Sequence, residues 1–220
     1  MDKRRQAAHD ESWESLVPFV QDVQDTYLVK KFPEGPERML DIGSEDGYLA
    51  LKYAELFKAQ QLDLVDLKKD KHSVSAEHVQ SHIFDVTSLE FRKWAQWQYD
   101  LVVSLKTLHE IDNALMAVFN SINALRHGGF AMFLDFSEEW WEQNLAMVQN
   151  GSLTMQHYTD DLRTTTKNGL RTNGGIESFW GYVNERVPGP MQLTFHQGSY
   201  AVLYEAAEWG QVKQKPVSNP

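Results

Sequence analysis

Apolar runs and helical patterns alternate along most of the chain. Five short apolar runs have the length and composition of buried strands. Apolar residues recur at helical spacing over residues 48–57, over residues 89–97, and from a cap at Asp112 to an end at Gly128-Gly129. Strands that alternate with helices predict right-handed crossovers and a mainly parallel sheet. The five predicted strands are residues 38–41, 61–67, 82–86, 100–104 and 130–135.

The pattern changes near the end of the chain. A helical pattern over residues 176–183 is followed by two alternating runs, residues 191–196 and 200–205, on either side of Gly198. Two such runs around a short glycine turn predict a β-hairpin, so one of the two strands must run antiparallel to the rest. The sequence therefore predicts an α/β fold with a doubly wound, mainly parallel sheet of seven strands and a C-terminal antiparallel hairpin.

Three segments lie outside this alternation. Residues 1–35 predict a helical preface, in which Pro18 should start or kink the helix. Residues from about 136 to 175 form a long polar insertion, and a segment of this length is usually functional or mobile. The main domain is expected over residues 36–210, and residues 211–220 are expected to be a disordered tail.

Composition and charge exclude several classes of protein. A chain of 220 residues with 42% hydrophobic residues can bury one sizeable core, which predicts one globular domain. The formal net charge of -10 argues against a nucleic-acid partner, because such proteins carry a basic face. The chain has no cysteine, which removes disulfides, thiolate metal sites and a cysteine nucleophile.

No apolar run is long enough to span a bilayer, and the charged N-terminus has no signal-peptide pattern. We therefore expect a cytoplasmic protein with no membrane partner, either a monomer or a homodimer. His78 and His82 are four residues apart, but no acid or third ligand is indicated nearby, so a solvated face is the simpler interpretation. No metal site is expected.

The turn from Asp41 to Gly47 joins the first predicted strand to an amphipathic helix. Such a junction places free backbone N–H groups beside the positive end of a helix dipole. Gly43 permits a tight turn, and Gly47 lets the helix start close to the sheet. Three carboxylates around the turn would repel a pyrophosphate but suit a ligand with a sulfonium and an amino group. A purely structural strand–turn–helix junction is the alternative.

Polar side chains stand at the ends of four successive predicted strands. They are Asp41, Asp66, Asp85 and Ser104. In open α/β sheets, ligands bind outside the carboxyl ends of the strands. A single acid in such a place is usually a solvated turn residue, whereas four in register favour a ligand site.

Two stretches resemble motifs of the class I S-adenosylmethionine-dependent methyltransferases. The turn from Asp41 to Gly47 resembles motif I, although the commonest form has a glycine where Glu45 stands. The stretch from Ser104 to Ile111 resembles the fourth motif, and the resemblance covers about residues 39–135. It implies S-adenosylmethionine as the cofactor, with Asp66 on the ribose hydroxyls and Asp85-Val86 at the adenine. The residues implied around the cofactor are Asp41, Gly43, Ser44, Gly47, Asp66, Leu67, Asp85, Val86, Ser104 and Leu105.

The resemblance also implies methyl transfer to an oxygen or nitrogen atom of a small molecule. His109, with Glu110 beside it, is the candidate general base, and the alternative is that its ring packs under the cofactor. Lys106, Trp140 and Trp141 are candidate acceptor-site residues, although an aromatic pair can also plug a core. The insertion and the preface are expected to form a lid, and the alternative for the preface is a helix that merely covers the edge of the sheet. An inactive binding or partner subunit of the same fold and a protein methyltransferase are the alternative functions.

Overall fold

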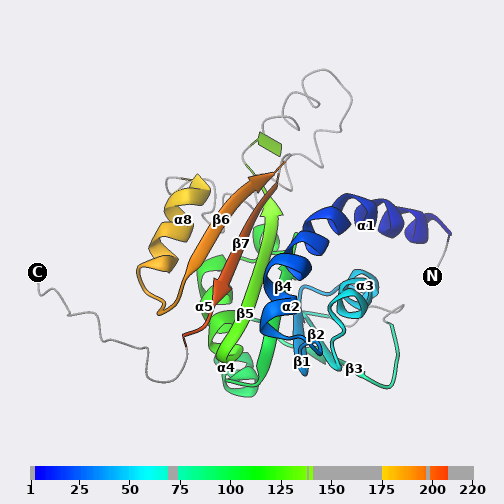
Figure 1. Cartoon of the computed structure of the whole chain (residues 1–220), viewed down its shortest axis with the longest axis horizontal. Coiled ribbons are helices and arrows are strands. Elements are labelled where there is room, and N and C mark those ends of the chain that lie inside the picture. The colour runs from blue at the N-terminus through cyan, green and yellow to red at the C-terminus, as the bar shows by residue number, and fades with distance from the viewer. Residues whose placement is uncertain (1–2, 69–73, 138, 141–174, 197–198, 208–220) are drawn as a thin grey trace, which may run out of the picture.

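The computed structural model describes residues 3–68, 74–137, 139–140, 175–196 and 199–207 of the chain. In this part of the chain, seven strands form one sheet in the order β3-β2-β1-β4-β5-β7-β6 (Figure 1). The strands are β1 (Arg38–Ile42), β2 (Gln61–Asp66), β3 (Val79–Ile83), β4 (Tyr99–Leu105), β5 (Leu125–Phe136), β6 (Met191–His196) and β7 (Ser199–Glu205).

The direction of the strands confirms the predicted fold class. β1 to β5 pair in parallel wherever they are neighbours, whereas β7 pairs antiparallel with both β5 and β6. The hairpin formed by β6 and β7 therefore supplies the one antiparallel strand that the sequence pattern required. The strand order reverses between β1 and β4, which is the switch point where α/β sheets bind ligands.

Helices cover both faces of the sheet. One face carries α1 (Lys3–Val23), a π-helical turn (Gln24–Leu28), the short α2 (Val29–Lys31) and α3 (Tyr48–Phe57). The other face carries α4 (Leu89–Ala95), α5 (Ala114–Ala124) and α8 (Gly175–Asn184), while a 3₁₀ turn (Leu108–Glu110) follows β4. Within the described residues, no helix combines the length and the apolar content needed to cross a membrane.

Two hydrophobic cores lie on the two faces of the sheet. One core includes Val20 of α1 and Tyr53 and Phe57 of α3. The other includes Phe91 of α4 and Trp180 of α8. Because the central strands are buried on both faces, their sequences are nearly continuous apolar runs rather than alternating ones. This is why the strands could be located from the sequence before their neighbours were known.

Pro18 does not start the N-terminal helix, so the prediction of a helix start at this residue was wrong. α1 runs without interruption from Lys3 to Val23 with Pro18 inside it. A proline leaves the carbonyl four residues earlier without its helical hydrogen bond. Here that carbonyl belongs to Glu14, and both residues are exposed, so water can supply the missing donor.

Three predicted boundaries also differ from the structure. α5 is capped by the side chain of Asn113 rather than Asp112, since Asn113 Oδ1 accepts from the Met116 N–H at 3.1 Å. The helix ends at Ala124, because the following residues pair with β4 instead of continuing the helix to the two glycines. β3 ends at Ile83, which leaves the predicted strand-end residue Asp85 two positions beyond it.

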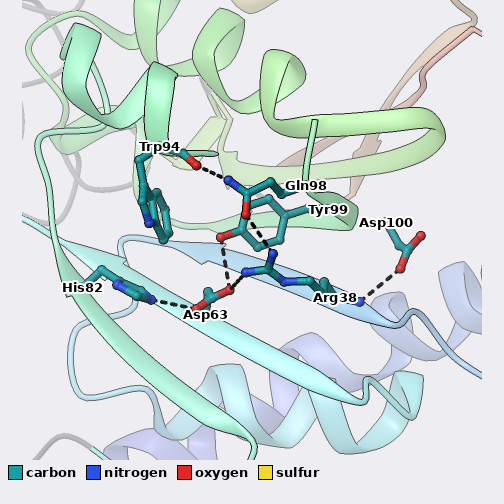
Figure 2. A network of polar contacts seen from close by, with 7 residues as sticks. All are labelled: Arg38, Asp63, His82, Trp94, Gln98, Tyr99 and Asp100. Atoms are coloured by element: carbon teal, nitrogen blue, oxygen red, sulfur yellow. Dashed lines mark hydrogen bonds and ion pairs between the residues drawn. The ribbon is translucent and has the colours of Figure 1, made fainter. Parts of the chain in front are cut away.

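A buried polar network crosses the first strands beneath α4 (Figure 2). The carboxylate of Asp63, only 4% exposed, accepts from Arg38 at 2.8 Å and from the Tyr99 hydroxyl at 3.1 Å, and it pairs with His82 Nε2 at 2.7 Å. Arg38 also donates to Gln98 at 2.8 Å. A buried carboxylate needs such donors. The solvated face predicted for His82 was therefore wrong, because this residue lies on a strand and turns toward Asp63.

Candidate active site

Asp41 lies at the carboxyl end of β1 and is nearly enclosed. Its side chain is 3% exposed and accepts a hydrogen bond from the hydroxyl of Tyr53 on α3. Burial raises the pKa of Asp41 to about 7, opposed by the Tyr53 hydrogen bond and aided by the negative charge of Asp66. A ligand cation placed beside Asp41 would stabilise its charged form.

The turn after Asp41 uses its own backbone donors. The N–H groups of Gly43 and Ser44 donate to the Val65 carbonyl at 2.9 and 3.3 Å. The Glu45 N–H donates to Asp66 Oδ2 at 2.9 Å, and the Gly47 N–H donates to the Ser44 carbonyl at 2.7 Å. The expectation of free N–H groups at this turn was therefore wrong for these four donors. A turn that presents carboxylates and few donors suits a cationic ligand better than a phosphate.

Three residues of the turn adopt left-handed backbone conformations. Gly43 has φ 76°, and a Cβ there would lie 2.1 Å from the Thr107 side chain. Gly47 has φ 81°, and a Cβ there would meet Leu64 at 2.5 Å. Glu45 has φ 49°, a conformation that favours glycine. The position at which this sequence departs from motif I is thus one where the backbone itself prefers the glycine of the common form.

The ends of β2 and β3 leave an apolar surface beside a carboxylate. Asp66 is half-buried at the end of β2, and the next residue, Leu67, is 71% exposed. Ile83, at the end of β3, is 61% exposed. A cavity of about 70 Å³ lies between the turn and these strand ends, with Asp66, Glu45 and Ile83 among its lining residues. Large apolar side chains exposed beside a polar cavity are typical of a surface that a ligand covers.

The predicted adenine residues lie just beyond β3. Asp85 is exposed, and its Oδ1 accepts from the Thr87 N–H at 2.8 Å and from the Thr87 hydroxyl at 2.7 Å. Val86 is buried in the core beneath α5, where its carbonyl accepts from Asn120 at 2.8 Å. Asp85 therefore remains accessible to a ligand, whereas most of Val86 is already covered by the protein.

The segment after β4 brings the fourth motif against the turn. The Thr107 side chain is packed against Gly43 and donates to the Leu105 carbonyl at 3.1 Å. Ser104 is fully buried, and its Oγ has no hydrogen-bond partner among the described residues. Lys106 has φ 53°, and its N–H donates to the Leu134 carbonyl at 2.6 Å. Motif I and the segment that carries His109 are therefore in direct contact.

His109 is held by a carboxylate that the sequence analysis did not assign to the site. The Asp135 side chain accepts from the His109 backbone N–H at 2.9 Å and contacts the ring Nδ1 at 2.7 Å. Both residues are buried, at 8% and 1% exposure. Glu110, the predicted companion, is exposed, and its carboxylate lies 3.8 Å from Nε2. Asp135, rather than Glu110, orients the imidazole.

Asp135 could have been found from the sequence. Asp135 ends an apolar strand, as Asp41 and Asp66 do, so the strand-end rule that selected those acids also applies to it. No local pattern showed that its partner would be His109. The hydrogen bond of Tyr53 to Asp41 was likewise not predicted, because it depends on how α3 packs against β1.

Aromatic rings and a lysine lie beside the imidazole. The Phe136 ring stacks on Trp140 with centroids 4.0 Å apart, and it meets the His109 ring edge-on at 5.0 Å. Lys106 Nζ lies 5.3 Å from the centre of the Phe136 ring. Burial lowers the pKa of Lys106, and the charge of Asp135 opposes this shift. Two of the three predicted acceptor-site residues, Lys106 and Trp140, therefore lie against the same ring, that of Phe136. The third, Trp141, lies outside the described residues.

The start of α1 is docked on the same turn. His9 Nε2 lies 3.0 Å from Asp46 Oδ2, and the His9 ring stacks on Tyr48 at 5.2 Å. The Tyr48 hydroxyl donates to Asp10 at 2.7 Å. Figure 1 shows α1 passing alongside α3. This position agrees with a covering role for the preface, while most of the insertion and the tail predicted at 211–220 lie outside the described residues.

A family model described as a methyltransferase domain matches residues 17–179 of the chain. This span includes the turn from Asp41 to Gly47, the fourth motif and the His109–Asp135 pair. The matched span exceeds half of the chain and includes the strands β1 to β5.

Solved structures of several methyltransferases have the same fold. An O-methyltransferase family protein from Burkholderia thailandensis is 12% identical, with a TM-score of 0.62 over 93% of this chain, which spans 60% of that protein. The plantazolicin methyltransferase BpumL, solved in complex with SAH, is 14% identical, with a TM-score of 0.65 over 93% of this chain and 90% of BpumL. The CurJ carbon methyltransferase is 11% identical, with a TM-score of 0.58 over 86% of this chain and 54% of CurJ. At such identities the likeness shows the fold.

Proposed function

Because the chain belongs to the methyltransferase domain family, we propose that it transfers a methyl group from S-adenosylmethionine to an oxygen or nitrogen atom of a small molecule. The observation that carries the proposal is the buried His109–Asp135 pair, next to a strand-end turn rich in carboxylates. A base is needed when the methyl acceptor is a hydroxyl or an ammonium group.

The residues at the strand ends fit this cofactor. Asp66 Oδ2 accepts from the Glu45 N–H at 2.9 Å and Oδ1 accepts from the Lys68 N–H at 3.4 Å. Each oxygen keeps a further lone pair for a ribose hydroxyl. Exposed Leu67 offers an apolar face to the adenine. Asp41 lies where a carboxylate would attract the amino group and the sulfonium. When bound, S-adenosylmethionine supplies an electrophilic methyl group on its sulfonium sulfur.

His109 is suited to accept a proton from the acceptor atom. The Asp135 carboxylate can only accept hydrogen bonds, so at 2.7 Å it selects the tautomer in which Nδ1 carries the hydrogen. Nε2 is then the basic nitrogen of the neutral imidazole. The second hydrogen bond, from the backbone N–H to the same carboxylate, fixes the direction of the ring. Deprotonation and alignment of the acceptor are what these residues contribute, because methyl transfer depends mainly on positioning and desolvation.

The surroundings of His109 favour a small acceptor that is partly aromatic. The stacked rings of Phe136 and Trp140 form an apolar wall, and Lys106 places a positive charge next to it. A phenol or a related hydroxyl compound matches such a wall, since the nearby cation stabilises the phenolate that forms as the proton leaves.

The test is turnover of S-adenosylmethionine to S-adenosylhomocysteine by the purified chain. Panels of phenols, aliphatic hydroxyl compounds, amines, peptides and carbon acids are supplied separately. We expect turnover with a hydroxyl or amine panel and loss of that turnover in His109→Ala. Turnover only with peptides would instead support a protein methyltransferase, and turnover only with carbon acids would exclude transfer to oxygen or nitrogen. Cofactor binding without turnover in any panel would support the inactive binding subunit.

A further inference from the structure

A second hollow lies away from the candidate active site. A groove of about 470 Å³ opens near the amino ends of β4 and β5, between α5, the end of α4 and the end of β7. Ligands of the methyltransferase site lie at the carboxyl ends of the strands, which is the opposite edge. The groove shares no residue with the candidate active site. Its volume falls within the range of about 300–1,000 Å³ that is typical of small-molecule sites.

The walls of the groove are apolar and partly uncovered. Trp97 is 61% exposed and Met116 is 40% exposed, and both line the groove. Phe119 and Ile122 on α5 and Val187 after α8 continue the same surface. Exposed apolar side chains gathered in one concave place mark an interaction site more often than side chains scattered singly.

One edge of the groove is formed by a bulge in β5. The pairing with β4 passes from Tyr99–Leu125 directly to Leu101–Phe130, so the four residues from Arg126 to Gly129 bulge out of the ladder. Bulges of this kind redirect side chains and are frequent beside functional sites. Here Arg126 and His127 become lining residues of the groove.

The bulge is fixed to the end of β7 by three hydrogen bonds. The Gly128 N–H donates to the Ala206 carbonyl at 3.2 Å, and the Ala206 N–H donates to the Gly129 carbonyl at 2.8 Å. The ring of His127 contacts the Ala207 carbonyl through Nδ1 at 3.1 Å, which requires Nδ1 to carry the hydrogen. Because the backbone is tied down in this way, the groove is formed before any ligand arrives, which lowers the entropy cost of binding.

Several cationic or hydrogen-bond-donating groups at the groove have no partner within the described residues. Arg92 is exposed, and its guanidinium has no acidic partner among the described residues. Arg126 pairs with Asp100 and Glu37 through its terminal nitrogens, yet its Nε is buried without a partner. The buried Nδ2 of Asn123 has none either. Unused buried donors next to a free guanidinium call for a ligand that brings negatively charged oxygen atoms.

We propose that this groove binds a small organic anion with an apolar body, such as an aryl or alkyl carboxylate or sulfonate. The apolar wall formed by α5 and Trp97 covers the body, and Arg92 with the bulge binds the anionic group. Charge complementarity favours this occupant, because a protein with a formal net charge of -10 repels anions at most other places on its surface. The proposal is independent of the methyltransferase reaction.

The test is a fluorescence titration of the full chain with 1-anilinonaphthalene-8-sulfonate, an aromatic sulfonate. We expect one saturable site, displaced by octanoate but not by the same concentration of octanol, and not displaced by S-adenosylhomocysteine. Arg92→Glu should weaken probe binding about tenfold or more, since it replaces a charge-assisted contact by repulsion. Lys93→Glu is the matched control, because Lys93 is the exposed neighbour on the same helix and does not line the groove. It should change the affinity less than about twofold.

Met116→Glu is a second exposed change in the groove and should weaken the probe similarly. Equal effects of Arg92→Glu and Lys93→Glu, or displacement of the probe by S-adenosylhomocysteine, would overturn the proposal. So would a tenfold gain in affinity in Trp209→Ala, because the chain's own end would then be the occupant. A dimer in light scattering that Met116→Glu converts to a monomer would make the groove an interface between copies instead.

Discussion

Asp135 binds His109 twice, through the backbone N–H at 2.9 Å and through the ring Nδ1 at 2.7 Å. The two residues are 26 positions apart in the chain. Asp135 lies near the end of β5, and His109 lies in the 3₁₀ turn that follows the neighbouring strand β4. A carboxylate that fixes both the position and the tautomer of a histidine prepares the other ring nitrogen for proton transfer. The proposed chemistry therefore depends on a pair of residues rather than on one.

The first prediction concerns this pair. His109→Ala should lower turnover by about 10²–10⁴-fold, the range of a lost general base, with little change in cofactor affinity. Asp135→Asn keeps the shape but offers an amide, so it should lower turnover by at least about tenfold and move the pH–rate profile. Steady-state kinetics over a range of pH and calorimetry with S-adenosylhomocysteine measure these effects. A weaker cofactor affinity with nearly normal turnover in His109→Ala would show that the ring packs under the cofactor instead.

The second prediction concerns cofactor affinity at Asp66. Asp66→Ala should weaken binding by about 2–4 kcal/mol, because two charge-assisted bonds to ribose are lost. The same carboxylate accepts the Glu45 N–H, so the variant also loosens the turn. Asp66→Asn retains one acceptor for that N–H and should lose less. Glu55→Ala, an exposed acid on α3, is the control in the calorimetry. If the unaltered chain bound NAD better than either sulfonium cofactor or its product, the cofactor assignment would be wrong.

The third prediction is a pH dependence of stability from Asp41. Its pKa is raised from 3.8 to about 7 in the folded protein, so between these values the folded state holds a proton that the unfolded state has lost. The free energy of unfolding therefore decreases as pH rises from 3.8 to about 7. The part of this decrease that falls between pH 5.5 and pH 8 is about 2 kcal/mol from this group alone. Urea unfolding should show that Asp41→Asn removes this part of the decrease. Parallel pH curves for the two proteins would contradict it.

Cofactor binding should show the opposite trend. The ionised form of Asp41 attracts the ammonium and sulfonium groups, so binding should tighten as pH rises toward 8 and should release a proton below pH 7. Calorimetry in two buffers of different ionisation enthalpy measures the released proton. Asp41→Asn is expected to abolish that release.

The fourth prediction concerns the departure from motif I at Glu45. Its φ of 49° is unfavourable for a residue with a Cβ, so Glu45→Gly should stabilise the fold by up to about 1 kcal/mol. Glu45→Ala is the matched control, because it removes the same carboxylate and keeps the backbone cost. Urea midpoints of the two variants should therefore separate, with the glycine variant higher. Equal midpoints would show that the turn is not strained at this position.

The fifth prediction is that α1 acts as part of a lid. His9→Ala breaks the contact with Asp46 and the stacking on Tyr48, so protease cleavage within α1 should become several-fold faster. S-adenosylhomocysteine should slow cleavage in the unaltered chain. Asp25→Ala changes an exposed acid in the π-helical turn and serves as the control. Identical cleavage rates with and without the cofactor product, in α1 and between Phe136 and Gly175, would leave the lid without support.

Much of the fold follows from the sequence because its signals are local. Strand burial on both faces produces apolar runs, and helix burial on one face produces helical spacing, whatever the partners are. The hairpin around Gly198 and the strand-end acids Asp41 and Asp66 could be located for the same reason. Boundaries were less certain where two local structures compete, as at Leu125, which continues the helical pattern but pairs with Tyr99 in the sheet.

The tertiary structure alone decided which polar groups meet. Asp135 was visible as a strand-end acid, but its bond to His109 exists because β4 and β5 are neighbours in register. His82 lies near Asp63 only because β2 and β3 pair side by side, a relation that no spacing within either strand encodes. Side-chain partners far apart in the chain are selected by packing and register, whereas periodicity records only whether a position is buried.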